Sequence, residues 1–103
     1  MSSAKNFGIN DLTKQKIINL INALIPEVKI YLFGSRAKGT YHERSDIDIA
    51  LDAGKPLNVS QLGELKDVLN ATNISYKIDV VDINSLPEDM YFNIKKELIL
   101  WKE

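Results

Sequence analysis

Residues 28–51, VKIYLFGSRAKGTYHERSDIDIAL, contain the pattern that decides the fold. Residues 28–33 alternate and are rich in β-branched and aromatic side chains, which predicts a strand that ends at Gly34. Residues 45–51 alternate acidic with aliphatic side chains and predict a second strand. The polar segment between them is expected to form one short helical turn and a loop.

Periodic apolar residues on either side of this segment predict further elements. A helix capped by Asn10 is expected to run to about Leu24, with Leu12 on its apolar stripe. A second helix is expected to begin at Ser60, whose side chain could cap it. Residues 76–83 are rich in β-branched side chains and predict a third strand.

The last part of the chain predicts one more helix. Residues 85–88, SLPE, combine a capping box with an early proline, which is typical of a helix start. Met90, Ile94 and Leu98 are expected to lie on the buried side of this helix. Residues 99–101 either end the helix or form a short edge strand.

The order of these elements predicts an α/β or α+β fold in which helices flank one small sheet. At 103 residues the chain is expected to hold a single domain at residues 10–103. Residues 1–9 show no periodicity and are expected to form a flexible N-terminal arm.

Composition narrows the class of function. The formal net charge is −1, so direct binding to nucleic acid is not expected. The sequence has no cysteine, which excludes thiolate chemistry and fits a reducing compartment. No apolar stretch approaches the ~20 residues that span a bilayer. We therefore expect a cytoplasmic protein that has no membrane partner.

Asp46 and Asp48 stand out because aspartate is a poor strand former, yet two occur in one short strand. Residues two apart on a strand project from the same face, with Cα atoms roughly 6 to 7 Å apart. Two carboxylates directed to one place repel each other unless a cation lies between them. Oxygen ligands suit Mg²⁺, which completes its shell with waters and substrate phosphates. The pair therefore predicts a magnesium-dependent site for a nucleotide.

Gly34, Ser35 and Arg36 are the candidate nucleotide-binding residues. At the start of a short helix, exposed N–H groups favour an anion, and glycine lets the backbone approach a phosphate closely. Ser35 adds a hydroxyl donor. Arg36 and Lys38 either neutralise phosphate oxygens or lie on the surface as ordinary charges. No lysine follows Gly39, so the segment is not a P-loop.

Asp79, in the third strand, is the third candidate carboxylate. If this strand lies beside the Asp46 strand, Asp79 joins the same metal site. Two ions would then polarise an attacking hydroxyl and stabilise the leaving pyrophosphate. Asp79 would orient the nucleophile and help to deprotonate it. The competing interpretation is a solvated edge strand, whose acids only oppose aggregation.

These residues together resemble the signature of a known family. FGS at residues 33–35, ten intervening residues, and DIDI at residues 46–49 resemble the signature of the polymerase-beta-like nucleotidyltransferase superfamily. Asp79 matches its later strand carboxylate. The chain is similar in particular to the minimal nucleotidyltransferases, from about residue 28 to residue 101.

This resemblance implies a mixed sheet, two Mg²⁺ ions and ATP as the donor substrate. Asp46, Asp48 and Asp79 would be the catalytic and metal-binding residues, and Gly34 and Ser35 would bind the nucleotide phosphates. It also implies that the chain is an antitoxin, which transfers AMP to a tyrosine of a partner HEPN toxin encoded nearby.

Two alternatives to this function stay open at this stage. The chain could be a non-catalytic, nucleotide-binding partner that inhibits the toxin by contact. It could also transfer nucleotides to a small molecule or to an RNA end. Its assembly is equally open, as a homodimer or as a hetero-oligomer with the partner.

Overall fold

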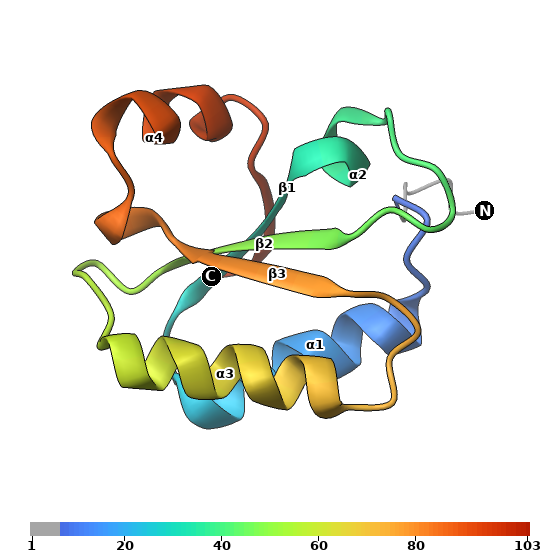
Figure 1. The fold of residues 1–103 in the computed structure, drawn as a ribbon, viewed down its shortest axis with the longest axis horizontal. Coiled ribbons are helices and arrows are strands. Elements are labelled where there is room, and N and C mark those ends of the chain that lie inside the picture. Colours follow the sequence, from blue (N-terminus) through green and yellow to red (C-terminus); the bar gives the residue numbers. More distant parts are fainter. Residues whose placement is uncertain (1–6) are drawn as a thin grey trace.

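A computed structural model describes residues 7–103, which form a four-stranded sheet with helices on both sides (Figure 1). In chain order the elements are α1 (Asp11–Leu24), β1 (Lys29–Phe33), α2 (Gly34–Lys38), β2 (Ile47–Asp52), α3 (Val59–Ala71), β3 (Ile78–Asp82), the 3-10 helix η1 (Ile83–Ser85), α4 (Glu88–Lys95) and β4 (Ile99–Lys102). The predicted fold class, with one small sheet flanked by helices, is confirmed.

The sheet is mixed, and its strand order is β3-β2-β1-β4. β1 pairs antiparallel with both β2 and β4, whereas β2 pairs parallel with β3. A parallel pair needs a crossover connection, and α3 provides it here. Residues 99–101 belong to the edge strand β4, so the second of the two predicted alternatives for this segment is correct.

Helices α1 and α3 lie side by side on one face of the sheet, and α2 and α4 lie on the other side (Figure 1). Ile47 and Ile49 of β2 point toward α1 and α3 and are fully buried in the core. Successive strand residues point to opposite faces, so Asp48 and Asp79 project away from this core. The sheet thus separates its packing face from an acidic face.

Two helix starts differ from the sequence prediction. Asn58, not Ser60, caps α3, because its side-chain oxygen accepts a hydrogen bond from the Ser60 N–H at 2.8 Å. Ser85 does not form a capping box, because its hydroxyl donates at 2.7 Å to Asp82, the residue that caps η1. An intervening 3-10 helix therefore displaces the start of α4.

Two predicted core residues are exposed instead. Leu12 is 84% exposed, because it lies about 140° around α1 from the buried Ile17, at roughly 100° per residue. Met90 is 46% exposed, because α4 reaches the core only near its C-terminal end, where Ile94 is buried as predicted. Leu98, which follows α4, is partly buried.

The segment before α1 also differs from its prediction. Residues 1–6 of the predicted arm lie outside the described residues. Ile9 is 1% exposed and belongs to the core, and the Phe7 carbonyl accepts a hydrogen bond from Arg36. Residues 7–9 are therefore part of the packed domain. No helix within residues 7–103 is both long and apolar enough to cross a membrane.

Candidate active site

Strand register brings the predicted site residues together. Asp48 in the middle of the sheet is paired with Phe33 on one side and with Asp79 on the other. Gly34 follows Phe33 directly, and Asp46 precedes β2 on the same face as Asp48. The expected position of the third strand beside the Asp46 strand is therefore confirmed.

The backbone of Gly34 lies directly against the side chain of Asp48. Gly34 has a φ of +78°, a conformation that favours glycine. A Cβ atom at this position would collide with the Asp48 carboxylate. The chain thus needs glycine here for two separate reasons, and the result is backbone that lies directly against a site carboxylate.

The ends of α2 and α4 add further charges at this point. The Gly34 N–H donates to Oε1 of Glu97 at 2.9 Å, and Nζ of Lys38 lies 3.8 Å from Oε2 of Glu97. Glu97 was not among the residues predicted from the sequence. The Ser35 hydroxyl has no partner within the described part of the chain, so it is available to a ligand.

The carboxylates on this face repel one another. Burial, as the largest cause, and the negative charges of Asp79 and then Asp46 together raise the pKa of Asp48 from 3.8 to about 6. Glu97 acts in the same direction, whereas the positive charge of Arg36 opposes it. A cation between these acids would relieve the repulsion.

The donor set fits a magnesium ion by its chemistry, since it consists of carboxylate oxygens on a partly buried face. The geometry is not preassembled: no three acidic, histidine or cysteine side chains within residues 7–103 converge closely enough to hold a metal ion as they stand. Asp48 and Asp79 are nevertheless neighbours by register on this face of the sheet.

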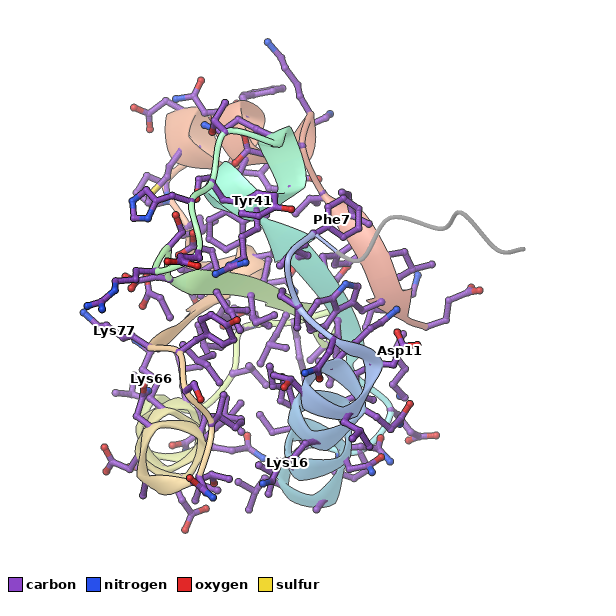
Figure 2. All side chains as sticks on the ribbon, turned by 90° about the vertical axis from the view of Figure 1, so that its right-hand side faces the viewer. Phe7, Asp11, Lys16, Tyr41, Lys66 and Lys77 are labelled. Carbon is purple, nitrogen blue, oxygen red and sulfur yellow. The ribbon has the colours of Figure 1, made fainter. Side chains whose placement is uncertain are left out.

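Arg36 occupies a different place from the predicted phosphate contact. Its side chain is fully buried, and every guanidinium nitrogen donates to a backbone carbonyl of Phe7, Glu43 or Ser45. The guanidinium also lies between the rings of Tyr41 and Tyr76 at 5.0 and 4.7 Å, and Figure 2 shows Tyr41 and Phe7 on the same side of the molecule.

These contacts give Arg36 a structural role. It ties the segment before α1 to the loop that leads into β2, and this loop carries Asp46. Its positive charge still acts on Asp48.

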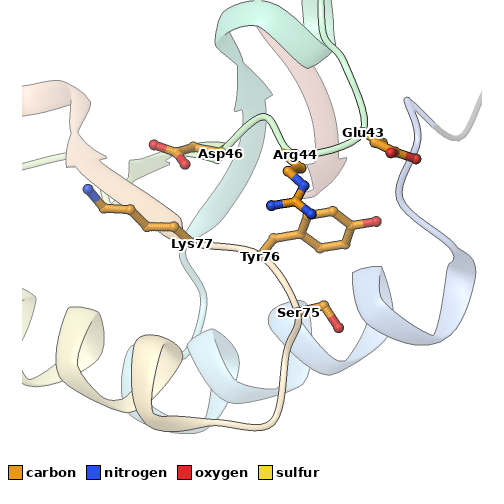
Figure 3. Close-up of a pocket in the computed structure, with 6 residues that line it drawn as sticks. All are labelled: Glu43, Arg44, Asp46, Ser75, Tyr76 and Lys77. Carbon is orange, nitrogen blue, oxygen red and sulfur yellow. The ribbon is translucent and has the colours of Figure 1, made fainter.

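A pocket of about 420 Å³ opens beside Asp46. Figure 3 shows the side chains that line it, which come from the loop before β2 and from the segment before β3: Glu43, Arg44, Asp46, Ser75, Tyr76 and Lys77. The cationic groups of Arg44 and Lys77 form no ion pair with any described residue. The pocket therefore offers space and positive charge next to a site acid.

Comparison with known proteins identifies the family of the chain. The family described as "Polymerase beta, Nucleotidyltransferase" matches residues 15–103. The chain belongs to this family. The resemblance seen in the sequence is thereby confirmed, for most of the chain's length.

Individual relatives and solved structures show more narrowly which members of the family the chain is similar to. The protein adenylyltransferase MntA of Shewanella oneidensis is 41% identical over 78 residues, which cover 75% of this chain and 55% of that protein. A chain in a crystal structure of a toxin-antitoxin with AMP-PNP is 34% identical, with a TM-score of 0.74, over 87% of this chain and 73% of that one. A chain in the structure of a tri-AMPylated S. oneidensis HEPN toxin with its MNT antitoxin is 30% identical, with a TM-score of 0.69, over 89% and 71%.

Sequence reasoning missed Glu97 because no pattern distinguishes it. It follows two lysines after a short helix and has no spacing to the other acids. Only the pairing of β4 with β1 brings it to Gly34. Asp82 has a structural role as the cap of η1: it is 3% exposed and accepts hydrogen bonds from the N–H groups of Leu57 and Asn84.

Proposed function

We propose that this chain is a magnesium-dependent adenylyltransferase that moves AMP from ATP to a tyrosine hydroxyl of a HEPN toxin, and so acts as its antitoxin. One observation carries the proposal. The backbone at Gly34 lies against Asp48, and Asp48 is the register partner of Asp79. A phosphate-binding turn and two carboxylates thus meet at one point, as phosphoryl transfer requires.

Each residue has a defined role in this reaction. Gly34 and Ser35 bind the ATP phosphates through the backbone N–H and the hydroxyl. The tyrosine oxygen attacks the α-phosphorus, a new oxygen–phosphorus bond forms, and the bond to the bridging oxygen breaks to release pyrophosphate. The phenolic proton passes to the carboxylate of Asp79.

Asp46 and Asp48, together with Asp79, would hold Mg²⁺. Bound at this place, the metal would neutralise the charge that develops on the phosphate oxygens. Arg36 contributes from a distance, because it fixes the loop that carries Asp46.

The relatives support a protein acceptor. One is named a protein adenylyltransferase, and another lies in a complex with an AMPylated HEPN toxin. The pocket beside Asp46 has room for an acceptor side chain. A cytoplasmic location is part of the same proposal, because ATP is the donor.

A transfer assay tests this function. The chain is incubated with the HEPN protein encoded beside it, Mg²⁺ and ATP labelled on the α-phosphate. We expect label on a tyrosine of the HEPN protein. The Asp46→Asn variant should lose this label, whereas Asp67→Asn, which removes an exposed acid from α3, should keep it.

The same variants separate catalysis from inhibition by contact. If Asp46→Asn still protects cells from the toxin while it transfers no label, the chain acts as a non-catalytic partner. If wild-type protein labels RNA or small molecules but never the HEPN protein, the acceptor has been assigned wrongly.

A further inference from the structure

Glu97 lies at the junction of two elements that fix its position. Its backbone N–H donates to the Ile94 carbonyl at 2.9 Å, at the end of α4. Two residues later, Ile99 begins β4 and pairs with Leu32 of β1. This pairing turns the Glu97 side chain toward the end of β1, where it is only 19% exposed.

The Glu97 carboxylate uses the groups that an incoming phosphate would need. Oε1 accepts the hydrogen bond of the Gly34 N–H at 2.9 Å, and this N–H is the backbone donor at the start of α2. Oε2 lies 3.8 Å from Nζ of Lys38, a cation of the same short helix. The Glu97 carboxylate therefore occupies both the Gly34 N–H and the Lys38 ammonium group.

We propose that Glu97 competes with the nucleotide phosphate for the Gly34 N–H. The Glu97 carboxylate must leave Gly34 before ATP can bind there. This inference rests on the nucleotide-binding role proposed above for Gly34. A carboxylate resembles a phosphate in charge and in its acceptor oxygens, so the same N–H can serve only one of them at a time.

Displacement has a consequence for Lys38. When Glu97 leaves, Nζ of Lys38 loses its partner and can pair with the phosphate instead. The exchange replaces one ion pair with another, so most of the cost of binding lies in moving Glu97 away from Gly34. Glu97 thus sets the affinity for nucleotide without contacting it, as a positioning residue.

Calorimetric titration with ATP and Mg²⁺ tests this inference on three proteins. Glu97→Gln keeps an oxygen that can accept from Gly34 but removes the charge. Glu64→Gln is the matched control, because it removes the same charge from the exposed surface of α3 on the other face of the sheet. We expect Glu97→Gln to bind ATP about three- to tenfold more tightly than wild type, and Glu64→Gln to bind it equally.

A purely structural role for Glu97 predicts the opposite result. If Glu97 only supports the Gly34 turn or binds the metal, Glu97→Gln binds ATP more weakly than wild type or with unchanged affinity, and either result overturns the inference. Lack of ATP binding by wild type and Glu97→Gln alike would refute both this inference and the nucleotide site. Because the titration needs no acceptor, failure of AMP transfer alone leaves the inference standing.

Discussion

Asp48 and Asp79 are register partners on the parallel strands β2 and β3, so their carboxylates project side by side from the same face of the sheet. The charge of Asp79 is the largest electrostatic cause of the raised pKa of Asp48 and is second only to burial. The folded protein therefore stores electrostatic strain at its centre, and this strain can be measured.

Asp48→Asn is expected to stabilise the metal-free protein at pH 8. The raised pKa of Asp48, about 6 against 3.8, means that the unfolded chain ionises this group more easily. The folded state therefore loses stability as the pH rises from about 4 through 6. We expect Asp48→Asn to raise the free energy of unfolding by about 1 kcal/mol at pH 8, after allowance for solvent screening, and by almost nothing at pH 4. Urea denaturation at both pH values measures this, and an equal gain at both would contradict it.

Gly34→Ala is expected to disrupt both the fold and the nucleotide site. The substitution puts a side chain at positive φ and drives it into the Asp48 carboxylate. We expect the free energy of unfolding to fall by about 3 kcal/mol and ATP binding to be lost. Gly39→Ala is the matched control, because Gly39 has a φ of +81° but open space around it. Equal effects of the two variants would show that the contact with Asp48 is unimportant.

Arg36→Lys tests whether this residue is structural. A lysine cannot reach the carbonyls of Phe7, Glu43 and Ser45 together or fill the space between the two tyrosine rings. We expect a loss of about 3 kcal/mol in the free energy of unfolding. Arg44→Lys, in the same loop but exposed, should stay within about 0.5 kcal/mol of wild type. A stable Arg36→Lys protein with reduced ATP affinity would restore the phosphate-binding role first predicted for Arg36.

Asn58→Ala and Ser60→Ala compare two candidate caps of α3. Because the Asn58 side chain accepts the hydrogen bonds at this helix start, Asn58→Ala is expected to lower the free energy of unfolding by about 1 kcal/mol. Ser60→Ala should leave it nearly unchanged. Thermal unfolding of the two variants side by side measures the difference, and the reverse order would mean that the cap is assigned wrongly.

The strands and the acidic site were predictable because their signals are local. Alternation marks β2, and the spacing from Gly34 to Asp48 is a pattern within one stretch of sequence. The residues around Asp79 predicted a strand, but its position beside β2 was only a condition of the prediction, which the structure meets. The strands were therefore placed correctly, although local helical periodicity wrongly predicted Leu12 and Met90 to be buried.

The errors came from contacts that no local pattern encodes. Arg36 is charged and close to the Gly34 turn, yet the Phe7 carbonyl and two tyrosine rings from other segments surround it. Glu97 reaches Gly34 only because β4 joins the sheet beside β1. The cap of α3 was predicted two residues too late, because the Asn58 side chain accepts the hydrogen bonds at this helix start instead of Ser60.

The site takes its parts from β1, β2, β3 and the turn before β4, so no fragment of the fold holds all of them. A locally unfolded chain would have no place for ATP, and ATP bound at such a site stabilises only the complete structure. At a concentration 100 times its dissociation constant, a ligand of this kind adds about 2.7 kcal/mol to the free energy of unfolding. We therefore expect the lifetime of this small protein among cellular proteases to follow the energy state of the cell.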